Sequence, residues 1–166
     1  MRFDLPGLAI LTALLGAAML AAAFAFQHLG GLDPCVLCIY QRWPWVGAVA
    51  AGLLALATTK AGHAGIVRLL LGLAAIAMLT GAGIAGFHVG VEQHWWAGTS
   101  ECGGVTGQAK TVEELKAQLM ATPVTRCDEV AWSLLGISMA GWNLIVSAAG
   151  GVLLAWQVIN RKPSAL

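Results

Sequence analysis

The sequence predicts an all-α membrane protein, a four-helix transmembrane bundle formed by one domain over residues 1–166. Hydrophobic residues make up 58% of the chain and charged residues only 10%, whereas a soluble domain carries about 25% charged residues. Four apolar stretches have or approach the about 20 residues that a transmembrane helix needs. The net charge of +1, with no basic run interleaved with aromatic residues, excludes a nucleic-acid-binding protein.

The four predicted spans cover residues 7–26, 35–58, 66–88 and 135–159. The first is longer than the roughly 7–15 residues of a signal peptide's apolar region, although Ala21-Ala22-Ala23 leaves a cleaved signal as the alternative. The start of the second span stays open between Cys35 and Pro44. Pro44 has no amide hydrogen and its ring opposes the carbonyl of Tyr40, so the helix either kinks there or begins at the proline. Glycine and alanine are dense in all four spans, which lets helix backbones approach closely in lipid.

The distribution of charge predicts the orientation. With four spans, one side receives five basic residues and one acid, namely Arg2, Lys60, Arg68, Arg161, Lys162 and Asp4. The other side receives four basic residues and seven acids. Because basic residues favour the cytoplasmic side, both termini are expected in the cytoplasm, with loops 27–41 and 89–134 on the outer face. All four cysteines fall in these outer loops, and disulfides persist in the bacterial periplasm, so we expect the loops on the periplasmic face of a bacterial inner membrane.

Seven tryptophans suit the aromatic belts of a membrane protein. Six fall near the predicted periplasmic ends of spans, where we expect them at the lipid interface: Trp43, Trp45, Trp95, Trp96, Trp132 and Trp142.

The first cysteine pair, Cys35 and Cys38, has the C-x-x-C spacing of a dithiol that can open and close. Asp33 and Pro34 predict a helix N-cap and first helical position, which would place both thiols in a first turn whose free amides favour a thiolate. Arg42 follows Cys38 by four residues and would share its helix face. It is predicted to lower the pKa of Cys38 and to hold the carbonyl oxygen of an electron acceptor; a snorkelling contact with lipid headgroups is the alternative.

The second pair, Cys102 and Cys127, lies in the long polar loop 89–134. A capping box beginning at Thr111 predicts a short amphipathic helix over residues 112–121, between the two cysteines. Spacing alone leaves open whether this pair is a structural staple or part of a redox relay, and the neighbouring C-x-x-C favours the relay. Arg126 would support a thiolate at Cys127.

Two further assignments concern ligands. We predict no metal, because structural zinc sites use two close cysteine pairs and only one is present. His88, at the periplasmic end of the third span, is the best candidate for a second contact with the bound ligand.

These residues resemble the disulfide bond formation protein B (DsbB) family. The resemblance rests on Phe26-Gln27-His28, on the run Pro-Cys-Val-Leu-Cys-Ile-Tyr-Gln-Arg at 34–42, and on a distal cysteine pair before a fourth span. It covers nearly the whole chain in element order. The family consists of four-helix inner-membrane quinone reductases that reoxidise DsbA, a periplasmic thioredoxin-fold oxidase.

The resemblance implies a role for each cysteine. Cys102 would form the mixed disulfide with the DsbA-like partner, and Cys127 would be its mate in the loop. Cys127 and Cys35 would exchange between loops, leaving Cys38 as the thiolate that faces the quinone, with Arg42 as a quinone contact.

We therefore expect a quinone-dependent protein-disulfide oxidoreductase whose acceptor is ubiquinone or menaquinone. The alternative is a non-enzymatic membrane protein held together by two structural disulfides.

Overall fold

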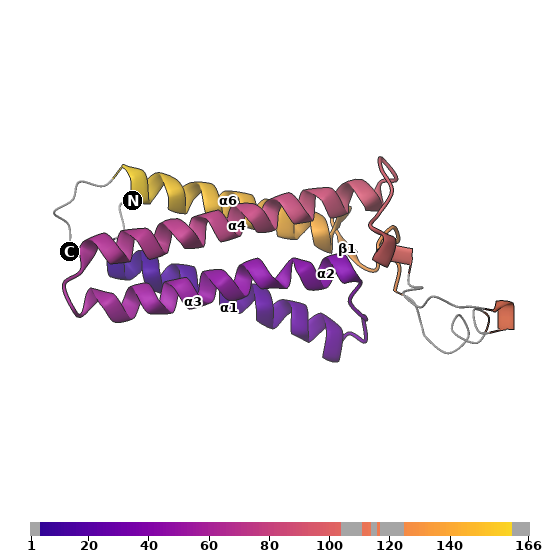
Figure 1. Ribbon diagram of the computed structural model, residues 1–166, viewed down its shortest axis with the longest axis horizontal. Coiled ribbons are helices and arrows are strands. Elements are labelled where there is room, and N and C mark those ends of the chain that lie inside the picture. The colour runs from indigo at the N-terminus through magenta and orange to yellow at the C-terminus, as the bar shows by residue number, and fades with distance from the viewer. Residues whose placement is uncertain (1–3, 104–110, 114–115, 117–124, 161–166) are drawn as a thin grey trace.

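The computed structural model describes residues 4–103, 111–113, 116 and 125–160. Four long helices lie side by side as a bundle (Figure 1): α1 (Leu5–His28), α3 (Arg42–Thr59), α4 (Ala64–Glu92) and α6 (Met139–Ile159). The predicted fold class, an all-α four-helix bundle, is confirmed. Within the bundle, α3 contacts both α1 and α4, and α4 also contacts α6.

Four short elements accompany the bundle. They are helix α2 (Val36–Tyr40), the 3-10 helix η1 (Ser100–Gly103), and strands β1 (Ser133–Leu134) and β2 (Ile137–Ser138). The strands pair in an antiparallel hairpin that turns at Leu135 and Gly136 with φ angles of 55° and 77°. Two consecutive positive φ values match the tight turn that best joins twisted strands. The predicted amphipathic helix at 112–121 lies mostly outside the described residues.

Side-chain caps define where two of the long helices begin. Asp4 accepts a hydrogen bond from the amide of Gly7 at 3.0 Å at the start of α1, and Ser138 does the same for Gly141 at 3.1 Å at the start of α6. Each cap satisfies an amide that has no partner within its own helix. The fourth predicted span, 135–159, therefore starts a few residues later than expected, because its first residues form the hairpin.

The predicted second span at 35–58 is divided into α2 and α3, which meet at Gln41. Pro44 occupies the third position of α3, where an amide hydrogen would have no intrahelical partner anyway. The predicted N-cap at Asp33 is wrong. Cys35 has extended backbone (φ −70°, ψ 169°), so the helix begins after it, and its Sγ atom accepts the amide of Cys38 at 3.3 Å.

Three of the four bundle helices, α1, α4 and α6, are long and apolar enough to cross a membrane. The fourth, α3, has 18 residues and begins with the polar Arg42. It falls outside that set although its position between α1 and α4 is that of a bundle member.

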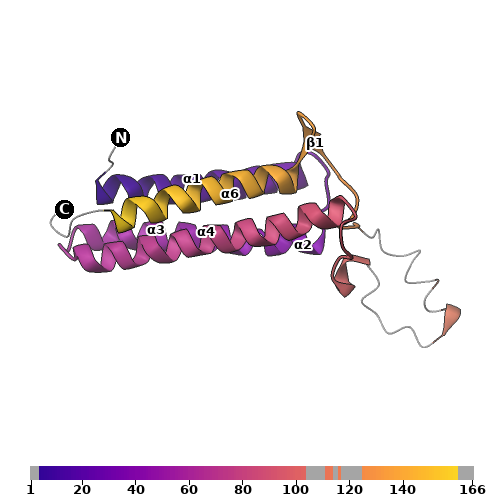
Figure 2. The same ribbon diagram turned by 90° about the horizontal axis from the view of Figure 1, so that it is seen from above.

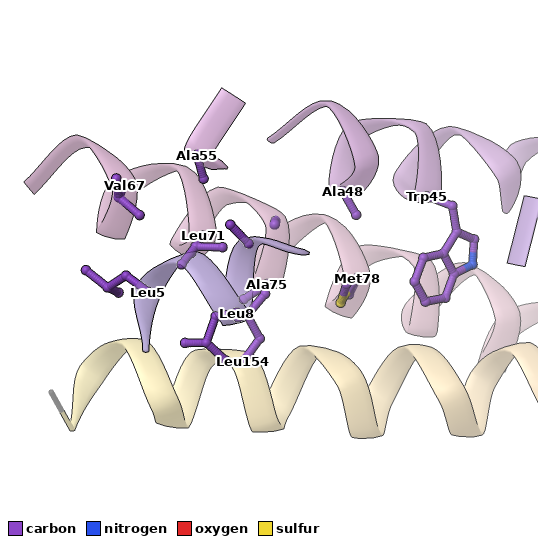
Figure 3. Close-up of a cluster of buried hydrophobic side chains, with 12 residues drawn as sticks. Leu5, Leu8, Trp45, Ala48, Ala55, Val67, Leu71, Ala75, Met78 and Leu154 are labelled. Carbon is purple, nitrogen blue, oxygen red and sulfur yellow. The ribbon is translucent and has the colours of Figure 1, made fainter. Parts of the chain in front are cut away.

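The core lies between the helices and combines large side chains with small ones (Figure 3). Leu71, Met78 and Leu154 are among its buried members. A Cβ atom on Gly52 would lie 2.9 Å from the backbone nitrogen of Ala13, so α1 and α3 depend on glycine for their close approach. Trp45, expected at the lipid interface, is only 3% exposed and belongs to this core, because it has a hydrogen-bond partner inside the bundle, described below.

Both views place the short elements at one end of the bundle. Helix α2 and strand β1 lie at that end, whereas α1 begins and α6 ends at the other (Figures 1 and 2). This arrangement agrees with the predicted separation of the termini from the cysteine loops.

Candidate redox site

All four cysteines gather at the end of the bundle that carries α2 and η1. Cys102 and Cys127 form a disulfide with a Cα–Cα distance of 5.2 Å. Cys35 and Cys38 are free thiols whose Sγ atoms lie 2.9 Å apart. Cys35, Cys102 and Cys127 belong to one buried cluster, and Cys38 packs against it. The structure thus brings together two pairs that are more than sixty residues apart in sequence.

Contacts between α2 and the segment of Cys102 hold the two pairs together. The hydroxyl of Tyr40 donates a hydrogen bond to a carboxylate oxygen of Glu101 at 2.7 Å. On the other side of Cys102, a Cβ atom on Gly98 would lie 2.8 Å from the Cβ and 3.0 Å from the Sγ of that cysteine. Glycine at 98 therefore leaves room for the disulfide against α4, where Val91 packs in the same cluster.

The two thiols of the first pair have opposite acidities. The pKa of Cys35 is lowered from 9.0 to about 4, first because the thiol of Cys38 donates a hydrogen bond to its sulfur; burial opposes this effect and a hydrogen bond from His88 adds to it. The pKa of Cys38 is raised, because that thiol donates its proton to Cys35 and because it is buried. Both residues precede α3, and neither lies in one of the helices that are long and apolar enough to cross a membrane. The prediction that Arg42 lowers the pKa of Cys38 is therefore wrong for the dithiol form.

Arg42 has other partners among the described residues. Its guanidinium donates a hydrogen bond to the side-chain oxygen of Gln27 at 2.8 Å and lies 4.9 Å from the centre of the Phe24 ring. Both partners belong to α1, so the arginine joins α1 to the start of α3. This geometry places the guanidinium beside a cavity.

That cavity has a volume of about 370 Å³. Its walls come from α1, α2, α3, the last turns of α4, residues 125–134 and the start of α6, and they are mostly apolar. The three residues predicted to bind the ligand, Arg42, Cys38 and His88, all line it. Aromatic walls come from Trp132 and Trp142.

His88, predicted as a ligand contact, is buried and also contacts protein side chains on both ring nitrogens. It is 3% exposed, with Nε2 at 3.6 Å from the Sγ of Cys35 and Nδ1 at 2.8 Å from the side-chain nitrogen of Gln41. The ligand atoms of Cys35, Cys38 and His88 lie within 4.8 Å of one another, a set that could hold a soft metal ion as well as carry disulfide chemistry.

Sequence reasoning missed the polar residues behind His88. Gln41 and Asn143 are both buried and hydrogen-bonded to each other at 2.6 Å. The position of Asn143 within a predicted membrane span indicates a specific hydrogen-bond partner, because a polar side chain there is costly. Glu92 is a second such residue: it is buried and accepts a hydrogen bond from the hydroxyl of Ser138.

Arg126, predicted to support a thiolate at Cys127, is paired elsewhere. Its guanidinium donates two hydrogen bonds to Asp128, at 2.9 and 2.6 Å. This pairing lowers the pKa of Asp128 to about 2. The charge of Arg126 is thus compensated at the surface by its neighbour.

The chain is similar over most of its length to proteins of one family. A family model described as "Disulfide bond formation protein DsbB" matches residues 6–157. A disulfide bond formation protein B from Methylococcus capsulatus is 40% identical over 151 residues, which are 87% of this chain and 90% of the relative. Proteins of the same name from Pasteurella multocida and Stutzerimonas stutzeri are 34% and 32% identical; the matches cover 85% and 97% of this chain, and 78% and 99% of those relatives.

Proposed function

Because this chain belongs to the disulfide bond formation protein B family, we propose that it oxidises a periplasmic dithiol protein and passes the electrons through its two cysteine pairs to a membrane quinone. The observation that carries the proposal is the gathering of the four cysteines beside a cavity, with Cys35, Cys102 and Cys127 in one buried cluster and Cys38 packed against it. Two structural staples would have no need to lie in contact with each other, whereas disulfide exchange requires one sulfur to reach another.

The first half of the reaction takes place at the loop pair. A thiolate of the reduced partner, a DsbA-like thioredoxin-fold oxidase, attacks the Sγ of Cys102, forms a mixed disulfide and releases Cys127 as a thiolate. The second partner thiolate then attacks the mixed disulfide and releases Cys102. The partner leaves with its disulfide restored, and the loop pair holds the two electrons as a dithiol.

The second half transfers those electrons to the first pair. The Cys127 thiolate attacks the Sγ of Cys35 in a Cys35–Cys38 disulfide and releases Cys38. Cys102 then attacks Cys127, which restores the loop disulfide and releases Cys35. Cys38 takes up a proton, so the first pair is left reduced as a Cys35 thiolate beside a Cys38 thiol, in keeping with the lowered pKa of Cys35 and the raised pKa of Cys38.

The cavity fits a quinone ring as the final acceptor. Its volume of about 370 Å³ lies in the range of small-molecule sites, which are mostly apolar with a few polar groups. A ubiquinone or menaquinone there would accept two electrons from the first pair, which would close again as the Cys35–Cys38 disulfide, and with two protons, from the Cys38 thiol and from solvent, it would leave as the quinol. Arg42 would hold a carbonyl oxygen with its guanidinium, Cys38 would present its sulfur to the ring, and His88 lines the same wall.

The direction of the bundle follows from the positive-inside rule. We place both termini in the cytoplasm and both cysteine pairs at the periplasmic face of a bacterial inner membrane. The common location of α2 and η1, at the end opposite the start of α1, supports this placement (Figure 1). Labelling of intact cells with a membrane-impermeant thiol reagent tests it, since the reagent should reach the reduced cysteines without opening the inner membrane.

The activity itself is tested with purified protein, a reduced DsbA-like oxidase and a quinone, by following quinone absorbance. We expect quinone reduction that requires the partner and is lost in a Cys102→Ser variant. Absence of quinone reduction by the wild-type protein, together with disulfides that resist mild reduction, would favour the alternative of a non-enzymatic protein with structural disulfides.

A further inference from the structure

A chain of buried hydrogen bonds leads from the core of the bundle to the first cysteine pair. The indole nitrogen of Trp45 is 2.8 Å from the side-chain oxygen of Asn143, and the side-chain nitrogen of Asn143 is 2.6 Å from the side-chain oxygen of Gln41. The nitrogen of Gln41 is 2.8 Å from Nδ1 of His88, and Nε2 of His88 is 3.6 Å from the Sγ of Cys35. The three polar side chains between Trp45 and Cys35, those of Asn143, Gln41 and His88, are each at most 9% exposed.

The groups along this series of hydrogen bonds determine which side chain donates and which accepts at each bond. An indole N–H can only donate, so Asn143 must turn its oxygen toward Trp45 and its nitrogen toward Gln41. Gln41 then offers its nitrogen to His88. The backbone carbonyl of Leu37, which can only accept, lies 3.3 Å from the same nitrogen and requires the same orientation.

We propose that Trp45, Asn143 and Gln41 are positioning residues that hold His88 as the tautomer with its proton on Nε2, so that the imidazole donates a hydrogen bond to the sulfur of Cys35. Because Gln41 donates to Nδ1, that nitrogen must be the acceptor of a neutral ring, and the proton must lie on the nitrogen that faces Cys35. Asn143 and Gln41 thus act on the thiol through His88 without touching it.

This inference rests on the proposed function and assigns His88 a specific part in it. In the relay, Cys35 is released as a thiolate when Cys102 restores the loop disulfide. An N–H aimed at that sulfur stabilises the leaving thiolate, and the opposite tautomer would place a lone pair against it. His88 therefore serves as a donor to Cys35 and not as the base that deprotonates it.

Ser147 provides a matched control from the same network. Its hydroxyl donates to the same oxygen of Asn143 at 3.2 Å, and it is fully buried. A hydroxyl can donate or accept, so Ser147 does not determine which way the amide points. A variant without this hydroxyl loses one hydrogen bond, but Trp45 and Leu37 still determine how the amides of Asn143 and Gln41 are oriented.

The test is the position of the proton on His88, read by ¹⁵N NMR of the full-length protein labelled at histidine. The sample is held in lipid nanodiscs at about pH 8, where an ordinary imidazole is neutral, without quinone or partner. The His88 signals are identified by their loss in His88→Gln. We expect Nε2 to carry the proton and Nδ1 to be bare, both in the wild-type protein and in Ser147→Ala.

In a Gln41→Glu variant we expect Nδ1 of His88 to carry a proton, the opposite of the wild-type protein. A carboxylate cannot donate, so Nδ1 of His88 should gain a proton in order to pair with it. Trp45→Phe is the second variant. It keeps an apolar ring in the core while losing the fixed donor, and it should give a larger Nδ1-protonated fraction than Ser147→Ala.

Two results would overturn the inference: a proton on Nδ1 in the wild-type protein, or a bare Nδ1 in folded Gln41→Glu. Neither depends on turnover. If the tautomer is as expected but the protein fails to reduce quinone, the proposed function falls and the hydrogen-bond chain stands.

Discussion

The acidity of Cys35 depends first on the thiol of Cys38, and replacing that thiol separates its contribution from the others. Cys38→Ala removes the side-chain donor 2.9 Å from the Cys35 sulfur, while the backbone amide at 3.3 Å and His88 at 3.6 Å remain. A hydrogen bond to a charged group contributes about 1.5–3 kcal/mol. At about 1.4 kcal/mol for each pH unit, the midpoint of Cys35 ionisation should rise by about 1–2 pH units.

Iodoacetamide labelling as a function of pH measures this midpoint, with the labelled cysteine located by mass spectrometry of fragments. Cys102 and Cys127 are joined in a disulfide in the structure, so in that state neither offers a thiol to the reagent. Because the pKa of Cys35 is lowered to about 4, its thiolate is present at neutral pH and is lost only as the pH falls through that value. Wild-type labelling should therefore stay near its plateau from neutral pH down to about pH 5.

Cys38→Ser is the matched control, since its hydroxyl can still donate to the Cys35 sulfur. We expect its midpoint to stay close to that of the wild type. Equal midpoints in Cys38→Ala and Cys38→Ser, or a wild-type midpoint near 9, would refute the account of the pair.

Three further outcomes are expected. Cys38→Ser should abolish quinone reduction yet still form the mixed disulfide through Cys102 on non-reducing gels; full quinone reduction by this variant would overturn the role of Cys38. Arg42→Ala should raise the Michaelis constant for quinone at least tenfold, by loss of a charge-assisted hydrogen bond of about 1.5–3 kcal/mol, while thiol exchange with the partner changes little; an unchanged constant would contradict the contact. Gly98→Ala should displace Cys102, because the new Cβ would lie 2.8 Å from the Cβ of that residue, and should slow partner oxidation in stopped-flow assays more than quinone binding; wild-type kinetics would show that the segment adjusts freely.

Hydropathy was sufficient to predict the bundle, because the apolar length of a helix is a local property of the sequence. The ends of the helices were less predictable, since caps compete over a few residues. At Cys35 a sulfur atom took the capping role expected of Asp33. Trp45 was misplaced for a related reason: its burial depends on Asn143, a partner 98 residues away.

The candidate site could be predicted in its residues but not in its connections. Motifs and positions along the chain indicate the cysteines, Arg42 and His88. The structure places Cys35, Cys38, Arg42 and His88 around one cavity, and it packs Cys102 and Cys127 in a cluster with Cys35. Which group each one contacts depends on helix packing that no local pattern encodes. Arg42 faces Gln27 instead of Cys38, and His88 reaches Cys35 because α4 packs against α2.

Direct electron exchange between the two cysteine pairs can be tested with one double variant. In Cys38→Ser combined with Cys102→Ser, only Cys35 and Cys127 remain, and both lie in the same buried cluster. Mass spectrometry of the protein isolated from the membrane without reductant should find these two joined by a disulfide. Two free thiols in the folded, oxidised variant would contradict the relay.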